Sequence, residues 1–203
     1  MAFRKTKYPS FLEDDVSVGK KVLIFFWEII KVVVISLAII VPVRYFLIKP
    51  FYVKGASMEP NYYDHEYLII DELTYRFALP ARGETVVFRA PIDKSQYFIK
   101  RIIGLPEEKI KVAGGKIYIF NQKFPEGSAL TESYLLPAMK TLGEVEVQLG
   151  PDEYYLLGDN RISSLDSRIF GPVQRADIVG RTFLRGWPID RIGVIKNDWQ
   201  YNL

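Results

Sequence analysis

The chain has 203 residues and a net charge of +3, from 27 basic and 24 acidic side chains, a balance that does not favour a nucleic-acid-binding protein. It has no cysteine, which excludes disulfides and a thiolate nucleophile, and one histidine, His65, which argues against a zinc site of the usual cysteine and histidine type. The length suits one domain of ordinary size in addition to one membrane-spanning segment.

The first predicted element is an apolar helix of membrane length. Residues 22–43 read VLIFFWEIIKVVVISLAIIVPV, which as a helix spans about 33 Å at roughly 1.5 Å per residue, against about 30 Å for the hydrocarbon core of a bilayer. Glu28 and Lys31 interrupt it three residues apart, a spacing that lets them pair on one helix face. We therefore predict a transmembrane anchor within residues 22–48.

The flanking charges predict how this anchor is oriented. Residues 1–21 hold five basic side chains against three acidic ones, and basic residues near a span favour the cytoplasmic side. We predict a cytoplasmic segment at 1–21 and an extracytoplasmic domain at 49–203, on a single-pass cell-membrane protein. The alternative is a cleaved signal peptide, which would have a shorter apolar region and a small-x-small site directly after it. Here Arg44 and bulky residues follow instead.

Residues 49–203 show many short β-patterned runs and no long amphipathic helix. The Ala-Gly-Gly-Lys sequence at 113–116 lies between two such runs and predicts a hairpin. Residues 121–148 are the least patterned and are expected to form an insertion. The fold predicted is mainly β: a single N-terminal transmembrane helix followed by an all-β domain of short strands. The predicted strands are 51–54, 67–71, 85–89, 97–103, 109–112, 116–120, 144–149, 153–157 and 178–187.

The first block of chemical interest is GASMEP at residues 55–60, just beyond the apolar segment. Glycine lets a backbone approach a substrate closely, and proline restricts the end of the turn. A serine between them, Ser57, could present its hydroxyl outward while its own N–H faces a developing oxyanion. Such turns are also common in ordinary loops, so the block alone is weak support for catalysis.

A serine nucleophile needs a base, and two residues are candidates. His65 is close in sequence, but its neighbours Asn61-Tyr62-Tyr63-Asp64 resemble a solvated loop. Lys100 lies in YFIKRIIGLP at 97–106, where a strand would place Phe98, Lys100 and Ile102 on one face. Apolar neighbours desolvate the amine and lower its pKa from about 10.4 towards about 8. A lysine that reaches from a strand edge into solvent is the alternative.

A third block, GDNRISSLDSR at residues 158–168, is dense in polar groups. Asp159, Arg161, Asp166 and Arg168 alternate in sign and could satisfy one another if partly buried. On composition alone the block is a polar surface loop. As a network of ion pairs it would form a rigid support.

The three blocks, in this order over roughly residues 20–185, resemble type I signal peptidases. The resemblance implies that Ser57, which precedes Met58 as in the family, is the nucleophile and supplies the oxyanion N–H. It implies that Lys100 is the base and that Ser164 orients it, with Ser163 and Ser167 as alternatives by proximity. Some members have a serine at the position of Gly55, so here the oxyanion site would use backbone N–H groups only.

The resemblance also assigns supporting and substrate-binding residues. The structural positions are Arg101, Asp159, Asp166 and Arg168. The walls of shallow pockets that admit small side chains fall on Phe51, Val53, Met58, Val87, Phe98 and Ile99. A place in the hydrophobic core is an equally natural interpretation for Val87 and Ile99.

The function implied is removal of N-terminal signal peptides from exported preproteins, by cleavage after small-x-small sites. The partners implied are preprotein signal peptides and membrane lipid, with no nucleic acid, no metal and no cofactor. Two alternatives stay open: a different serine–lysine hydrolase, such as the self-cleaving repressor-type proteases, and a non-enzymatic membrane-anchored β domain that binds preproteins.

Overall fold

The computed structural model describes residues 18–46, 49–137, 139–196 and 201, with the side chains of 42–46 left out. Most of the predicted cytoplasmic segment, residues 1–17, and residues 47–48 of the predicted anchor lie outside the described residues. The chain divides into two compact units, Met1–Val43 and Arg44–Leu203, which are treated separately below.

The first unit is built on helix α1 (Val18–Phe46). Within the described residues it is the one helix long and apolar enough to cross a membrane, over Val18–Val41, with a mean hydropathy of 2.5. Glu28 and Lys31 form the predicted ion pair, with 2.6 Å between Lys31 Nζ and Glu28 Oε1. None of the apolar window of this helix is buried against other parts of the protein. A bilayer supplies the apolar surroundings that this surface requires, and a helix satisfies its own backbone groups there.

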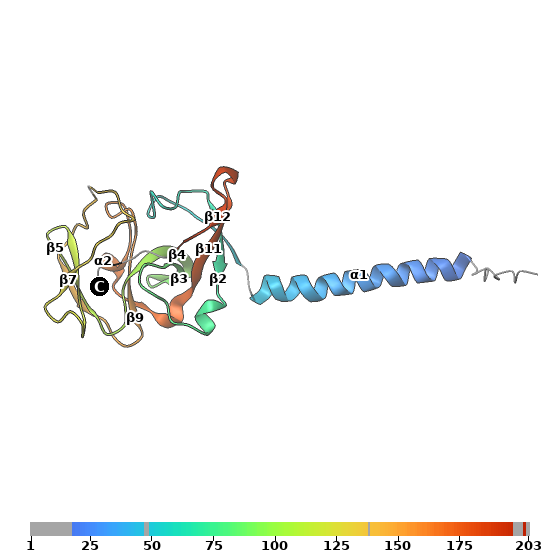
Figure 1. Cartoon of the computed structure of the whole chain (residues 1–203), viewed down its shortest axis with the longest axis horizontal. Coiled ribbons are helices and arrows are strands. Elements are labelled where there is room, and N and C mark those ends of the chain that lie inside the picture. Colours follow the sequence, from blue (N-terminus) through green and yellow to red (C-terminus); the bar gives the residue numbers. More distant parts are fainter. Residues whose placement is uncertain (1–17, 47–48, 138, 197–200, 202–203) are drawn as a thin grey trace, which may run out of the picture. The chain divides into compact units, whose positions relative to one another are not determined.

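The second unit consists mainly of two antiparallel sheets, seen in Figure 1 as the strands around β3, β4 and β11 and the strands around β5 and β7. In the larger sheet the described strands follow the order β1-β2-β11-β3-β4-β9-β10, with β12 paired to β11. The smaller sheet has the order β7-β6-β5-β8.

The larger sheet contains β1 (Lys49–Tyr52), β2 (Tyr67–Asp71), β3 (Thr85–Ala90), β4 (Asp93–Gly104), β9 (Glu153–Leu157), β10 (Val173–Gln174), β11 (Ile178–Trp187) and β12 (Gly193–Val194). The smaller contains β5 (Lys109–Ala113), β6 (Lys116–Phe120), β7 (Ser128–Ala129) and β8 (Val145–Gln148). The short helices are η1 (Thr74–Arg76), α2 (Ser167–Phe170), η2 (Arg175–Asp177) and η3 (Ile189–Arg191).

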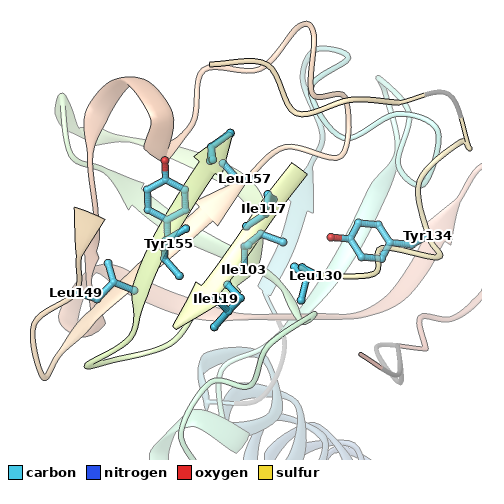
Figure 2. Close-up of a cluster of buried hydrophobic side chains, with 10 residues drawn as sticks. Ile103, Ile117, Ile119, Leu130, Tyr134, Leu149, Tyr155 and Leu157 are labelled. Carbon is cyan, nitrogen blue, oxygen red and sulfur yellow. The ribbon is translucent and has the colours of Figure 1, made fainter. Parts of the chain in front are cut away.

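One buried cluster joins strands of both sheets (Figure 2). Ile103, Tyr155 and Leu157 come from β4 and β9, whereas Ile117 and Ile119 come from β6. Buried residues alternate with more exposed ones along β5 and β6, as expected for strands that cover a core on one face. This packing fixes β4 and β9 firmly, and β4 is the strand that carries Lys100.

The mainly β prediction is confirmed, and the predicted bounds of β2, β6, β9 and β11 agree with the structure. The hairpin at 113–116 is confirmed as well: Ala113 pairs with Lys116, and Gly114 and Gly115 have φ values of 58° and 80°. Positive φ at both central residues is what a tight hairpin turn requires. Three strands of two residues, β7, β10 and β12, were not predicted because they are too short to show a hydrophobic pattern.

Segment 121–148, which the sequence leaves almost unpatterned, joins the smaller sheet. It contributes β7 and β8, and Leu130 and Tyr134 are buried in the cluster of Figure 2. A segment held by a few long-range contacts of this kind has little local periodicity for sequence reasoning to detect.

Candidate active site

The centre of the site is a contact between Lys100 and Ser57. Lys100 Nζ lies 2.7 Å from Ser57 Oγ and donates to the Ile99 carbonyl at 2.8 Å. The lysine is 4% exposed and pairs across the sheet with Val86 of β3. Its Nζ also lies 5.6 Å from the centroid of the Phe98 ring, which is on the same strand face. An amine and a hydroxyl at this distance have the geometry for proton transfer.

The electrostatic surroundings of Lys100 favour its neutral form. Burial lowers its pKa from 10.5 to about 8, in the direction predicted from its apolar neighbours. The negative charges of Asp166 and Asp159 oppose this shift but do not cancel it. A substantial fraction of the amine is therefore neutral at slightly alkaline pH.

The turn that carries Ser57 is held by backbone contacts on both sides. The Asn160 N–H donates to the Ser57 carbonyl at 3.0 Å, and Asn160 Nδ2 donates to the Ala56 carbonyl at 3.1 Å. On the other side the Gly55 N–H donates to Asp64 Oδ1 at 2.9 Å, and Gly55 has a φ of 91°, a conformation that favours glycine. Within the described residues the Ser57 N–H donates to no acceptor, so it is available to an incoming oxyanion.

Ser164 lies beside the nucleophile, but it makes no contact with the lysine. A Cβ atom added at Gly158 would meet both Ser164 Oγ and the Ser57 carbonyl oxygen, so these two groups pack against the same glycine. Ser164 Oγ is buried, and its hydroxyl interacts with the Asp166 carboxylate and helps to lower the pKa of that group. The hydrogen bond to Lys100 that the resemblance implies is thus not formed, because Nζ is directed at Ser57 and the Ile99 carbonyl.

The two alternative serines lie in different surroundings. Ser163 is exposed, and its N–H donates to Asn160 Oδ1 at 3.2 Å. Ser167 is buried, and its Oγ accepts from the Leu156 N–H at 2.9 Å. Ser167 therefore fixes the loop to β9.

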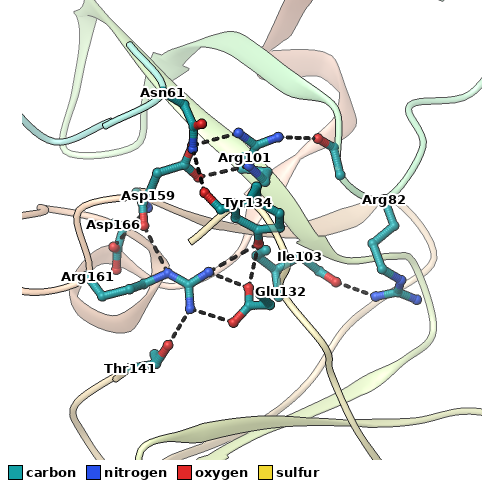
Figure 3. A network of polar contacts seen from close by, with 12 residues as sticks. Asn61, Arg82, Arg101, Ile103, Glu132, Tyr134, Thr141, Asp159, Arg161 and Asp166 are labelled. Atoms are coloured by element: carbon teal, nitrogen blue, oxygen red, sulfur yellow. Dashed lines mark hydrogen bonds and ion pairs between the residues drawn. The ribbon is translucent and has the colours of Figure 1, made fainter. Parts of the chain in front are cut away.

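A buried ion pair lies behind the site (Figure 3). Arg101 binds Asp159 through two hydrogen bonds, Nε to Oδ1 at 2.8 Å and Nη2 to Oδ2 at 2.6 Å, and both side chains are at most 1% exposed. Arg101 also donates to the Gly83 carbonyl at 2.7 Å and stacks on the Tyr134 ring, 4.1 Å from its centroid. Asn61 Nδ2 donates to Asp159 Oδ2 at 2.9 Å. This arrangement joins the nucleophile block, β4 and the 158–168 loop.

The charge pattern of the loop included a second buried cation, Arg161, but the resemblance did not assign it a supporting role and its carboxylate partner Glu132 was not predicted. Its guanidinium pairs with Glu132, with Nη1 2.8 Å from Oε2, contacts Thr141 Oγ1, and donates from Nε to the Gly158 carbonyl at 3.0 Å (Figure 3). The alternating charges of the loop were the one signal for Arg161. Nothing local could have identified Glu132 and Thr141, because both lie in the unpatterned segment 121–148.

The 158–168 loop closes on a third ion pair. Arg168 binds Asp166 from Nε at 2.9 Å and from Nη2 at 2.8 Å, and the Gly158 N–H donates to the same carboxylate at 3.1 Å. Asp166 also caps α2 through the Arg168 N–H. Burial raises the pKa of Asp166, but the Arg168 guanidinium and the Gly158 N–H outweigh it and hold that pKa below its ordinary value. Asp166 is therefore ionised at neutral pH.

A pocket of about 190 Å³ opens at Ser57 and Lys100. Three of the predicted wall residues line it, Phe51, Phe98 and Ile99. The other three, Val53, Met58 and Val87, are at most 2% exposed and pack in a core cluster with Ile99. Sequence reasoning did not select the remaining lining residues, Tyr52, Lys54, Tyr97 and Leu165.

A second pocket, of about 380 Å³, adjoins the first. Phe51 and Tyr97 line both pockets and so separate one from the other, and Val87 lines the second. An extended peptide on this surface would find two adjacent hollows for side chains.

His65 is not part of this arrangement. Its side chain is 74% exposed, and its Nδ1 lies 3.1 Å from Asp64 Oδ2. It has a φ of 67°, which marks a turn. It lines neither the pocket at Ser57 nor the adjoining one. Among the described residues no group of three or more His, Asp or Glu side chains could hold a metal ion.

Comparisons with known proteins show to which family the chain belongs. The family model "Signal peptidase, peptidase S26" matches residues 26–187. The chain is 37% identical to a probable signal peptidase I-2 of Synechocystis over 178 residues, which cover 84% of this chain and 78% of that protein. It is 34% identical to a signal peptidase I of Leptolyngbya laminosa, over 82% of each chain. A crystal structure of a signal peptidase I from Enterococcus faecalis V583 is 28% identical, has a TM-score of 0.43, and covers 51% of this chain and 97% of its own. Because the family model spans most of its length, the chain belongs to the signal peptidase family, peptidase S26.

Proposed function

We propose that this protein is a membrane-anchored endopeptidase that removes signal peptides from preproteins with Ser57 as nucleophile and Lys100 as general base. The observation that carries the proposal is the 2.7 Å contact between Lys100 Nζ and Ser57 Oγ in a buried site. Membership of the signal peptidase family supports the substrate class.

The reaction begins with neutral Lys100, which accepts the proton of Ser57 as Oγ attacks the scissile carbonyl carbon. The carbonyl π electrons move to oxygen, and the Ser57 N–H stabilises the resulting oxyanion. The protonated amine of Lys100 then donates its proton to the leaving nitrogen, and the C–N bond breaks to leave an acyl-enzyme. Water, deprotonated by Lys100, attacks this ester; as the ester C–O bond breaks, the Lys100 ammonium returns the proton to Ser57 Oγ, and the carboxylic acid product leaves. A neutral base of pKa about 8 matches a reaction at slightly alkaline pH.

The support residues keep these two groups in position. Arg101 and Asp159 fix β4 to the 158–168 loop, and Asp166 with Arg168 closes that loop around Gly158. Ser164 is assigned an orienting role towards Lys100, formed when substrate is bound. Its buried hydroxyl interacts with Asp166 and packs against the same glycine as the Ser57 carbonyl, so it lies close to the nucleophile.

Pocket size determines which side chains are accepted. The pocket beside Ser57 has a volume of about 190 Å³ and is walled by Phe51, Phe98, Ile99 and Leu165. Walls of this kind exclude bulky side chains at the position before the scissile bond. The adjoining pocket would receive the side chain two residues earlier, since alternate side chains of an extended peptide point the same way. The resemblance to signal peptidases implies cleavage after small-x-small sequences, and the pocket of about 190 Å³ supports a small side chain at the position before the scissile bond.

The apolar helix α1 holds the enzyme at the lipid bilayer, where inserted signal peptides are present. The basic residues before it place the N-terminus in the cytoplasm and residues 49–203 on the other side. Anchoring raises the effective concentration of enzyme over membrane-inserted substrate.

The test compares cleavage of a preprotein by the full chain in detergent and by four variants. Ser57→Ala and Lys100→Ala should each lower the rate by roughly a thousandfold or more, and the double variant should be hardly worse because the two residues act as a unit. His65→Asn is the matched control, since asparagine tolerates the positive φ of that position, and it should keep full activity. Substantial cleavage by Lys100→Ala at neutral pH would exclude the serine–lysine mechanism.

Two further measurements address the alternatives. A serine-directed acylating inhibitor should label Ser57, whereas a non-enzymatic binding domain would not react. Ser164→Ala should slow cleavage with little change in stability, because the Arg168 guanidinium and the Gly158 N–H still hold Asp166 after the hydroxyl is removed. Full activity of Ser164→Ala would remove Ser164 from the mechanism.

A further inference from the structure

A third pocket, of about 230 Å³, shares no lining residue with the pocket at Ser57. Among the described residues, its walls include four cationic side chains, Arg101, Arg185, Arg191 and Lys196, and no carboxylate. Cationic walls without a carboxylate favour an anionic occupant.

The charges around this pocket do not balance. Arg185 and Arg191 share a single carboxylate, with Arg185 Nε 2.8 Å from Glu66 Oε2 and Arg191 Nη1 2.5 Å from Glu66 Oε1. Glu66 is 1% exposed, so its one negative charge is fully engaged by two guanidinium groups. Asp159 neutralises Arg101, whereas exposed Lys196 adds a further positive charge. The pocket therefore carries an excess of two positive charges.

The two arginines also have hydrogen-bond donors to spare. Arg185 Nη2 donates to the Asn61 carbonyl at 2.7 Å, and Arg191 Nη2 approaches the same oxygen at 3.4 Å. Within the described residues no acceptor meets Arg185 Nη1 or Arg191 Nε. Arg185 lies over the Tyr62 ring at 5.6 Å and Arg191 over the Tyr63 ring at 4.4 Å, and these contacts restrict both guanidinium planes. Two oriented guanidinium groups with unused N–H donors match the oxygens of a tetrahedral oxyanion.

We propose that this pocket is a binding site for a phosphate-type oxyanion, held by Arg185 and Arg191 with Lys196 at the rim. The same chemistry is offered by free inorganic phosphate and by the phosphodiester of a lipid headgroup. A lysine attracts any anion as a point charge. The planar guanidinium groups instead favour anions whose oxygens are spaced as in phosphate, because two N–H donors can bind two such oxygens.

The experiment titrates the full chain, in a detergent without phosphate, with two soluble probes at constant ionic strength. These are inorganic phosphate and glycerophosphoglycerol, the headgroup of an anionic lipid freed from its chains. Isothermal titration should show saturable binding of one equivalent. Tighter binding of the first probe identifies free phosphate as the ligand, and tighter binding of the second identifies the lipid headgroup. Absence of saturable binding of both probes overturns the proposal.

Two variants and a control locate the bound anion. Arg185→Lys keeps the positive charge for Glu66 but removes the planar pair of donors, and should weaken binding roughly tenfold. Lys196→Glu changes an exposed side chain, so the fold is retained, and should weaken binding at least about fivefold. Lys123→Glu makes the same change at an exposed lysine outside the pocket and should bind as the unmodified chain does. Equal affinities in Lys196→Glu and Lys123→Glu would refute the assignment, and circular dichroism of each variant verifies that it is folded.

Discussion

Replacing Lys100 with methionine should stabilise the protein at neutral pH while abolishing activity. The pKa of Lys100 falls from 10.5 in the unfolded chain to about 8 in the fold, chiefly through burial. A pKa lowered to about 8 corresponds to about 3 kcal/mol of stability, which the folded state loses whenever the pH lies below about 8. Methionine has a similar length and no charge, so it avoids this cost.

The net gain is smaller, because the substitution also removes two hydrogen bonds. Lys100 Nζ contacts Ser57 Oγ and the Ile99 carbonyl, and each such bond contributes about 1 kcal/mol. About 1 to 2 kcal/mol of additional stability should remain at pH 7. The sign follows from proton binding: between pH 8 and 10.5 the unfolded chain binds more protons at Lys100 than the folded one, so the unmodified protein gains stability as the pH rises through this range. The methionine variant lacks that gain.

The assay is denaturant unfolding of the full chain in detergent, followed by tryptophan fluorescence from pH 6 to pH 11. Tyrosines titrate in both proteins at alkaline pH, so the difference between variant and unmodified chain isolates Lys100. Lys123→Met, at an exposed lysine, is the control and should change stability by less than about 0.5 kcal/mol. In the unmodified chain kcat/KM should rise tenfold per pH unit below about pH 8 and level off above it. A Lys100→Met variant that is less stable than the unmodified chain at pH 7, with an unchanged pH dependence, would refute the reasoning.

Three further predictions concern the support network, the loop glycine and the anchor. Arg101→Ala leaves a buried carboxylate without its partner and should cost about 3 to 5 kcal/mol in denaturant unfolding, whereas Glu146→Ala, in the exposed pair with Lys109, should cost far less. Gly158→Ala should lower both activity and melting temperature, since its Cβ would lie 2.5 Å from the carbonyl oxygen of the nucleophile, and Gly186→Ala, whose nearest atom is at 3.8 Å, should change neither. Protease added to intact spheroplasts should degrade residues 49–203, and full protection of that domain would reverse the predicted orientation.

Several features could be predicted because they depend on neighbours in the sequence. The helix at Val18–Val41 follows from the apolar run at 22–43, in which Glu28 and Lys31 are the charged residues, and the hairpin at 113–116 follows from two glycines that tolerate positive φ. Strands such as β6 and β9 have the predicted bounds because alternation and turn residues mark both ends locally. The first strand residues of β4, from Asp93, were missed, because they pair with β3 without an apolar pattern of their own.

The chemistry at the site depends on distances that no local pattern contains. Ser57 and Lys100 are 43 positions apart and meet because β4 pairs with β3 in one particular register and Asn160 holds the nucleophile turn. Glu132 reaches Arg161 from a segment without any pattern. The motifs identified Ser57 and Lys100 as candidates, but the distance between them and the burial of Lys100 depend on the whole fold.

From sequence alone come the apolar anchor, the β-rich domain and the resemblance that selected Ser57 and Lys100. Only the tertiary structure decided which apolar side chains line the pocket: Val53 and Met58 are buried in the core, whereas Leu165 and Tyr97 reach the site. It also decided the low pKa of Lys100. The physical reason is the separation in sequence of the interacting residues. Side-chain alternation and turn conformation depend on residues a few positions apart. Desolvation, ion pairing and pocket shape depend on atoms that packing brings together from distant parts of the chain.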